Sequence, residues 1–149
     1  MARALIVGCG CRGRRLGAEL RERGWEVRGT SRSAAGLKEI ERAGLEPAQA
    51  DPDRPGTILD LCGDTAVVVW LLASASGEGD AIAAIHGSRL ERLLEKLVDS
   101  PVRGFLYETG DAEHVATGRK IVERAGETWR IRVGFPGEPT AEDVLRLIG

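Results

Sequence analysis

The sequence predicts an α/β fold in which a six-stranded parallel sheet lies between two layers of helices. Strand-like and helix-like segments alternate along the chain, which is typical of such a three-layer sheet. The segment from Thr65 to Leu72 is an unbroken apolar run, as expected of a central strand buried on both faces. The first apolar segment leads directly into a glycine-rich turn. We therefore expect one domain over residues 1–149, doubly wound, with strand order 3-2-1-4-5-6.

Apolar periodicity and turn residues give the expected bounds in the first half of the chain. Gly24 and Gly44 follow the first two helices, Ser33 precedes the second, and Pro47 marks the third strand as an edge strand. We expect strands at Arg3–Val7, Trp25–Thr30 and Leu45–Ala50, and helices at Arg14–Arg23, Ala34–Ala43 and Thr57–Leu61.

The second half continues the alternation after a loop of small residues from Ser74 to Gly79. A long helix is expected from Asp80 to Val98, with an apolar face at helical spacing. Thr140 opens a last short helix, and Asp143 stands where a capping box places its partner. The other expected elements are strands at Val102–Tyr107 and Trp129–Val133 and a helix at Ala112–Ala125 that ends at Gly126.

The glycine-rich turn matches the dinucleotide-binding fingerprint of a Rossmann fold. Gly8, Gly10 and Gly13 are spaced as G-x-G-x-x-G between a strand and a helix, the context that gives this short motif its meaning. The first glycine permits the turn, the second lets the backbone approach a pyrophosphate, and the third allows close packing of the helix. Cys11 and Arg12 lie at the helix start, where free N–H groups meet an anion.

The residues after the second strand favour NADP over NAD. An acidic residue is expected there for the ribose of NAD, whereas Arg28 to Ser33 contains none. Arg32 suits the 2′-phosphate of NADP, and Arg12 is a second candidate for the same phosphate. Hydroxyl donors stand beside Arg32 at Thr30, Ser31 and Ser33.

Two further strand ends are expected to contact the cofactor. Asp51 follows the third strand; it would face the adenine amino group or serve as a turn residue or helix cap, and both interpretations stand. Leu72, Ala73 and Ser74 follow the fourth strand and would lie beside the nicotinamide ribose.

Composition excludes several classes of protein. A net charge of −2 argues against nucleic acid as the main partner, and the absence of an 18-residue apolar run argues against a membrane span. We expect no signal peptide, because the N-terminus leads directly into a strand. The odd number of cysteines, two of them in a tight loop, argues against a disulfide framework and for a reducing cytoplasm. Cys9 and Cys11 have no second ligand pair for a metal; a reactive Cys11 thiol at the helix start is the alternative interpretation.

Leu5–Ser33 and the strand Val102–Tyr107 resemble the extended and atypical branches of the short-chain dehydrogenase/reductase superfamily. More narrowly, they resemble NAD-dependent epimerase/dehydratase-like proteins. The resemblance implies a dinucleotide cofactor, a small-molecule substrate, and a homodimer in which the helix from Asp80 pairs with its copy. Relatives carry a substrate-binding region after the sixth strand, and we expect this chain to lack it.

The resemblance also implies a Ser or Thr after the fifth strand and a Tyr-x-x-x-Lys on the next helix. Thr109 matches the hydroxyl, but Ala116 stands four residues before Lys120. Thr109 and His114 are therefore the catalytic candidates, and we expect His86 to be solvated.

Three hypotheses about function follow. The first is an NADP-dependent oxidoreductase or epimerase-like enzyme acting on a small carbonyl compound. The second is a non-catalytic NADP(H) sensor that acts through a protein partner, and the third is a chain that folds but binds nothing.

Overall fold

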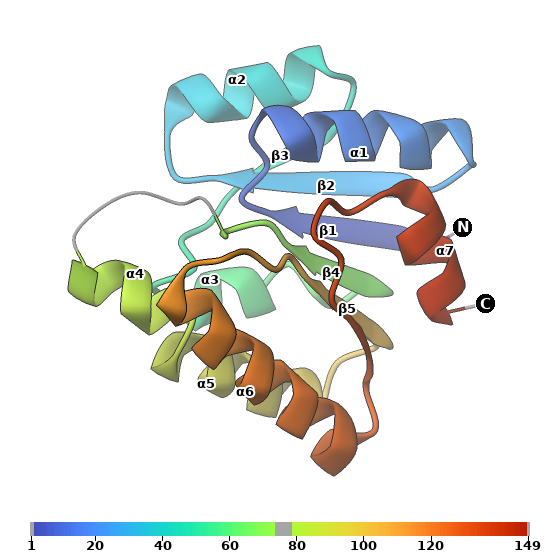
Figure 1. The fold of residues 1–149 in the computed structure, drawn as a ribbon. Coiled ribbons are helices and arrows are strands. Elements are labelled where there is room, and N and C mark those ends of the chain that lie inside the picture. The colour runs from blue at the N-terminus through green and yellow to red at the C-terminus, as the bar shows by residue number, and fades with distance from the viewer. Residues whose placement is uncertain (1, 74–78, 149) are drawn as a thin grey trace.

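Six parallel strands form one sheet in the order β3-β2-β1-β4-β5-β6, in a computed structural model that describes residues 2–73 and 79–148. The chain fills one half of the sheet outward from β1 and then the other half outward from β4 (Figure 1). The predicted fold class and strand order are confirmed. The strands are β1 (Arg3–Val7), β2 (Glu26–Ser31), β3 (Glu46–Gln49), β4 (Val67–Trp70), β5 (Gly104–Tyr107) and β6 (Arg132–Gly134).

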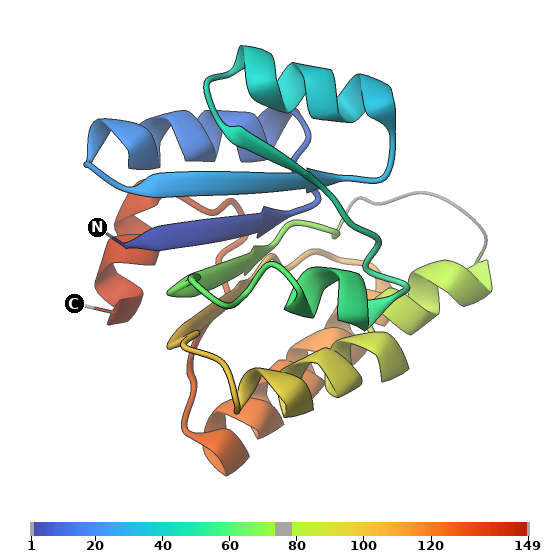
Figure 2. The ribbon, with the colours of Figure 1, turned by 180° about the vertical axis from the view of Figure 1, so that it is seen from behind.

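Helices cover both faces of the sheet (Figures 1 and 2). One face carries α1 (Cys11–Glu22), α2 (Ala34–Arg42) and α7 (Ala141–Ile148). The other carries α3 (Pro55–Leu59), α4 (Gly79–Ile85), α5 (Ser88–Leu97) and α6 (Glu113–Trp129). Of the helices in residues 2–73 and 79–148, none combines the length and apolarity that crossing a membrane requires.

Alternation along the strands divides the core into two apolar clusters. In β1, Leu5 and Val7 pack with the buried side chains of α5 and α6, whereas Ala4 and Ile6 pack with those of α1 and α2. The same alternation separates Val68 from Val69 in β4. Because successive strand side chains point to opposite faces, the apolar runs of β1 and β4 supply both layers, as the prediction of buried parallel strands requires.

Local capping residues position the helices much as the sequence predicts. Ser33 Oγ accepts a hydrogen bond from the Gly36 N–H at 3.1 Å at the start of α2. Asp143 Oδ2 accepts the Thr140 N–H at 2.9 Å, and Thr140 Oγ1 accepts the Asp143 N–H at 3.3 Å. These reciprocal bonds are the expected capping box of α7. The edge position of β3 is also confirmed.

The single long helix expected from Asp80 to Val98 is wrong. The chain forms α4 and α5 instead, and the break falls at His86 and Gly87. Gly87 is the N-cap of α5 with φ −128° and ψ −112°, which is neither helical nor extended, and a Cβ there would lie 2.8 Å from the Ala83 carbonyl oxygen. The surface that the sequence suggested for pairing with a second copy is therefore not one continuous helix.

The bounds of α6 and β6 also differ from expectation. α6 does not end at Gly126 but continues to Trp129, and β6 starts at Arg132 rather than Trp129. A Cβ at Gly126 would lie 3.1 Å from the Val133 side chain, so this glycine allows α6 to approach β6 rather than ending the helix. At the other end of the fold, α1 begins at Cys11, three residues before the predicted Arg14.

His86 is buried, and its expected solvation is wrong. Its side chain is fully buried, Nε2 lies 2.9 Å from the Leu72 carbonyl oxygen, and Nδ1 lies 2.5 Å from the Tyr107 hydroxyl. Since a carbonyl only accepts, Nε2 carries the proton and Nδ1 accepts from Tyr107. The apolar pattern of the predicted helix did not reveal this burial. A histidine directly after Ile85 fits the polar face of a helix equally well.

Burial lowers the pKa of His86, and the nearby His114 lowers it further, whereas the hydrogen bond to Leu72 opposes both. The unfolded chain, with an ordinary histidine pKa of about 6.5, then binds a proton before the folded chain does. We predict that the free energy of unfolding decreases as the pH falls from about 7.5 to about 5.5, because ionisation through this window favours the unfolded state. Denaturant titrations at a series of pH values measure it.

His86→Gln keeps an N–H donor for Leu72 but does not titrate, so its unfolding free energy should vary less over the same pH range. His114→Gln is the matched control, because it removes the neighbouring ring and keeps His86. Equal pH dependence in the wild type and in His86→Gln would contradict the assignment.

Candidate functional site

The turn between β1 and α1 approaches the end of β4 more closely than any side chain would allow. Gly8 has φ +84°, and a Cβ there would lie 2.6 Å from the Leu71 carbonyl oxygen and 2.7 Å from Leu72 Cδ2. The Gly8 N–H donates to Thr30 Oγ1 at 3.4 Å, and the Cys9 N–H donates to the Thr30 carbonyl at 3.2 Å. The turn is therefore held between the carboxyl ends of β2 and β4.

Gly10 leaves open space at the start of α1. It is the N-cap of the helix without a side-chain hydrogen bond, and a Cβ built there would meet nothing within 4 Å. The first N–H groups of a helix have no partner inside it and favour an anion. The turn thus presents backbone donors, beneath free space, to a negatively charged ligand.

A cavity of about 580 Å³ opens beside this turn. It lies where the strand order reverses between β1 and β4, the place where open parallel sheets bind ligands. Seven predicted residues line it: Gly8, Gly10, Thr30, Ser31, Arg32, Asp51 and Leu72. Of the other predicted cofactor residues, Cys11, Arg12, Gly13, Ser33 and Ala73 are not part of its wall, and Ser74 lies outside the described residues.

The β2 end of the cavity carries positive charge. Arg14 and the exposed Arg32 both line it, and neither forms an ion pair within residues 2–73 and 79–148. Ser31 Oγ accepts the Ser33 N–H at 3.2 Å, so the Ser31 hydroxyl lies beside the start of α2. Gly36, from the first turn of α2, also lines the wall. Arg14, Arg32 and Ser31 therefore contribute two cationic side chains and one hydroxyl to the wall of one cavity.

Asp51 performs the structural role that the sequence left open, and it also lines the cavity. Its Oδ1 accepts the Asp53 N–H at 2.9 Å, which closes a turn, and its own N–H donates to Thr57 Oγ1 at 2.9 Å. Asp53 is paired with Arg89 of α5 at 3.2 Å. The Asp53 charge is thus matched by a cation from outside the cavity wall.

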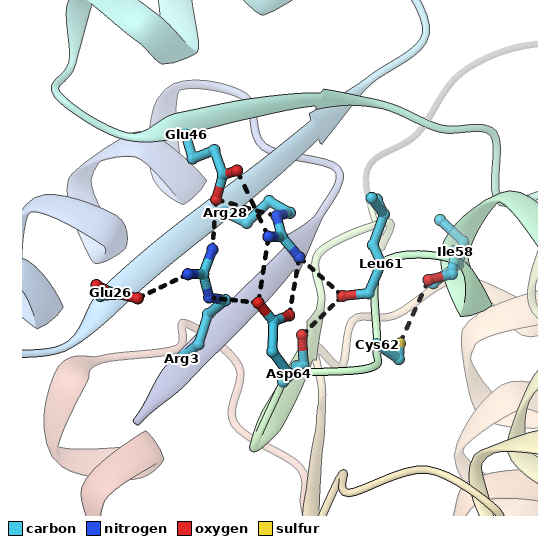
Figure 3. Close-up of polar contacts among 9 residues, drawn as sticks. Arg3, Glu26, Arg28, Glu46, Ile58, Leu61, Cys62 and Asp64 are labelled. Carbon is cyan, nitrogen blue, oxygen red and sulfur yellow. Dashed lines mark hydrogen bonds and ion pairs between the residues drawn. The ribbon is translucent and has the colours of Figure 1, made fainter. Parts of the chain in front are cut away.

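Arg28, the first residue of the acid-free stretch, belongs to a different part of the surface. Figure 3 shows its guanidinium between Glu46 and Asp64, with N–O distances of 3.1 Å to each. Burial alone would lower the pKa of Arg28, but the hydrogen bonds that it donates to these two carboxylates raise it. Arg3 extends the network to Glu26. Arg28 therefore joins β2 to β3 and to the turn before β4, and it does not line the cavity.

Arg12 points toward the opposite side of the crevice from Arg32. Its guanidinium pairs with the carboxylate of Glu108, which is buried at the end of β5. Glu108 also accepts the Ala73 N–H at 3.1 Å. Because β5 and β2 lie on opposite sides of β1 and β4, Arg12 and Arg32 do not meet at one phosphate site in this structure. Nothing in the residue pattern distinguished Glu108 from a surface carboxylate.

The two catalytic candidates lie near β5 but outside the cavity wall. Thr109 Oγ1 donates to the Pro136 carbonyl at 3.3 Å, and the Thr109 N–H donates to the same oxygen at 3.0 Å. Thr109 therefore anchors the loop between β6 and α7. His114 packs against His86 with ring centroids 4.8 Å apart, and its Nε2 is buried without a hydrogen-bond partner among the described residues.

The cysteines are free, and their surroundings separate them. Cys9 is buried against Gly29, and burial raises the pKa of its thiol to about 12, although Arg14 opposes the shift. Cys11 is exposed at the start of α1. Among residues 2–73 and 79–148, no three His, Cys, Asp or Glu side chains gather as a metal site would require.

Residues that the sequence prediction missed complete the cavity. Arg14 and Gly36 come from the first turns of α1 and α2, and Ile82 and Ile85 from α4 close the side opposite the glycine turn. The isoleucines belonged to a predicted apolar helix face, so their contribution to a wall was not separable from burial. For Arg14, the signal was its position directly after Gly13.

No protein-family model matches the chain. Protein YeeZ of Escherichia coli is 27% identical over an alignment of 169 positions that covers all of this chain and 59% of YeeZ. The alignment is longer than the chain, so YeeZ carries residues without a counterpart here. The chain thus spans about three fifths of the length of the curated relative it matches.

Solved structures of epimerases and reductases share the fold. UDP-glucose 4-epimerase from Thermotoga maritima superposes with a TM-score of 0.75 at 16% identity, covering 89% of this chain and 54% of the epimerase. Triphenylmethane reductase from Citrobacter, solved with NADP(H), has a TM-score of 0.66 at 13% identity and coverages of 89% and 48%. Other structures with this fold hold NAD. The resemblance to extended short-chain dehydrogenases/reductases and epimerases is therefore confirmed at the level of the fold, over nine tenths of this chain.

Proposed function

We propose that the chain binds NADP(H) in the crevice beside Gly10 and acts as an oxidoreductase or epimerase-like protein on a small carbonyl compound. The observation that carries the proposal is the 580 Å³ cavity, which joins the start of α1 to two guanidinium groups without ion-pair partners among the described residues. Backbone donors at one end and cations at the other suit a dinucleotide with an additional phosphate.

Each part of the cavity has a role in this proposal. The Gly8–Gly13 turn would hold the pyrophosphate through the first N–H groups of α1, and the open space at Gly10 is what that approach needs. Arg32, Arg14 and Ser31 would hold the 2′-phosphate, and Asp51 would lie near the adenine. Leu72 and Ile85 would form an apolar wall toward the nicotinamide half. When bound, the cofactor supplies or accepts a hydride.

Charge supports NADP over NAD. A carboxylate at the end of β2 would accept hydrogen bonds from ribose hydroxyls and repel a phosphate, but this chain has Ser31 and Arg32 there. Of the two acidic residues in the turn after β3 that line the cavity, Asp53 is paired with Arg89 and Asp51 accepts the Asp53 N–H. Free thiols at Cys9, Cys11 and Cys62 are consistent with the cytoplasmic location that is part of the same proposal.

The side chains available for proton transfer lie near the end of β5. The chain has no Tyr-x-x-x-Lys, and the Tyr107 hydroxyl is bonded to His86. The Thr109 hydroxyl is engaged with Pro136. Of the two candidates, His114 has the freer group, since its Nε2 has no partner among the described residues. In this proposal His114 is the candidate proton-transfer group, and Thr109 orients the loop between β6 and α7.

The first prediction concerns the glycine turn. Gly10→Val should abolish NADPH binding, because the new side chain would occupy the space above the α1 N-terminus. The fold should be retained, since Gly10 has an ordinary φ of −85° and its Cβ direction is open. Titration of NADPH followed by cofactor fluorescence measures binding, and circular dichroism checks the fold. Unchanged NADPH affinity in this variant would show that the ligand does not approach this turn.

The second prediction concerns cofactor choice. NADPH should bind more tightly than NADH, and Arg32→Ala should remove most of the difference. A hydrogen bond to a charged group contributes about 1.5–3 kcal/mol, so the loss in NADPH affinity should be roughly tenfold or more. Calorimetric titration of both cofactors measures it, with Arg21→Ala, an exposed arginine of α1 away from the cavity, as the control. NADH binding as tight as NADPH would sink the assignment.

The third prediction concerns rate. General acid–base catalysis typically contributes about 10²–10⁴-fold, and the Tyr-x-x-x-Lys pair is lacking. NADPH oxidation with small aldehydes, ketones and sugar nucleotides should therefore stay below about 1 s⁻¹, at or under the low end of ordinary enzyme rates. His114→Ala should lower the residual rate without changing NADPH affinity. Faster turnover that is insensitive to His114→Ala and Thr109→Ala would place the active centre elsewhere.

A further inference from the structure

A second groove lies at the opposite edge of the sheet from the dinucleotide cavity. It has a volume of about 330 Å³ and forms where β5 and β6 begin and where α5, α6 and α7 end. Val98, Trp129 and Ile148 give it an apolar lining, and Arg103, Arg130 and Arg132 stand around them. None of these residues has a role in the proposed dinucleotide site.

The groove gathers the exposed apolar surface of the chain. Val98 is 51% exposed and Trp129 is 44% exposed. Within residues 2–73 and 79–148, these are the large hydrophobic side chains that are exposed. Single exposed apolar residues are ordinary, but these two line the same groove, together with Ile148. Tryptophan and arginine are also the residues most enriched where binding energy concentrates at protein interfaces.

The charge of the groove has one sign. No Asp or Glu lines it, and none of its three arginines forms an ion pair with a carboxylate of the described residues. Arg132 donates to the Leu147 carbonyl at 3.3 Å, which leaves its charge uncompensated. The chain as a whole has a net charge of −2, so this concentration of positive charge is local. The complementary ligand is acidic.

Arg130 holds a left-handed backbone conformation at the end of α6. Arg130 caps the C-terminus of α6 with φ 57°. Among the residues that the structure describes, no other residue except glycine has a positive φ. Glycine is the usual residue there, because a Cβ is disfavoured in this conformation. Unfavourable backbone conformations concentrate at functional positions.

We propose that this groove binds an acidic segment of a partner protein, with an apolar side chain between Trp129 and Val98 and carboxylates on the three arginines. A groove of this size accommodates one or two side chains rather than a helix face. It lies at the start of β6, which is the last strand of the sheet and pairs only with β5 among the described strands. An extended segment alongside that edge would present alternate side chains to the groove.

The test uses the whole chain and a fluorescein-labelled six-residue peptide in which aspartate alternates with leucine. Fluorescence anisotropy should show saturable binding that weakens as salt is added. A peptide with lysine in place of aspartate, and one with serine in place of leucine, should not bind. Each of Arg130→Gly and Arg132→Ala should weaken binding by about fivefold, as expected for a partly exposed ion pair. Arg21→Ala is the matched control and should bind as the wild type does.

Arg130→Gly has a second readout that separates recognition from folding. Glycine adopts positive φ without steric conflict, so this variant should melt at a higher temperature than the wild type while it binds the peptide more weakly. A lower melting temperature would mean that the arginine stabilises the fold, and the proposal would fail.

Other outcomes also decide the matter. Binding of the lysine peptide as tight as that of the aspartate peptide, or binding unaffected by both arginine variants, would overturn the proposal. A concentration-dependent dimer in sedimentation that Arg130→Gly abolishes would overturn it by making a second copy of the chain the occupant. NADPH affinity should be the same in all these variants, so failure here leaves the proposed function unaffected.

Discussion

The packing of the β1–α1 turn between the ends of β2 and β4 is the constraint on which the rest of the structure depends. Because Gly8 has no side chain, its backbone can lie against the backbone at Leu71, directly after β4. Cys9 fills the space above Gly29 of β2. A Cβ at Gly29 would lie 2.6 Å from Cys9 Sγ. This contact fixes the direction in which α1 leaves the sheet, and so it sets where the free N–H groups of α1 meet the crevice.

The crevice is electrostatically divided by that turn. On the β2 side, Arg14 and Arg32 leave positive charge at the cavity wall. On the β5 side, Glu108 is buried and is neutralised by Arg12 and by the Ala73 N–H. A buried carboxylate is stable only when it is paired in this way. The ion pair and this hydrogen bond therefore connect α1, the segment after β4 and the end of β5. On the β2 side, Arg14 and Arg32 form no ion pair among the described residues.

Polar side chains at the end of β5 are engaged in contacts that hold neighbouring segments. Tyr107 is buried with its hydroxyl on His86, and burial raises the pKa of that hydroxyl. The phenol therefore stays neutral and packs the core, where it holds the break between α4 and α5. Thr109 likewise serves the β6–α7 loop. Tyr107 and Thr109 thus position segments around the crevice, and among the described residues His114 Nε2 has no hydrogen-bond partner.

Local sequence predicted most of the elements and part of the site. Alternating apolar segments predicted the six strands and their order, because burial on both faces demands continuous apolar runs such as Val67–Trp70. The spacing of Gly8, Gly10 and Gly13 predicted the turn, since positive φ and close approach are properties of single residues. Tertiary structure decided which charged and aromatic groups meet. Glu108 with Arg12, and Tyr107 with His86, are separated by 96 and 21 residues, and no local pattern encodes such a pairing. The break at Gly87 and the continuation of α6 past Gly126 were also tertiary outcomes, because at each glycine the packing of a distant neighbour determines whether a helix ends.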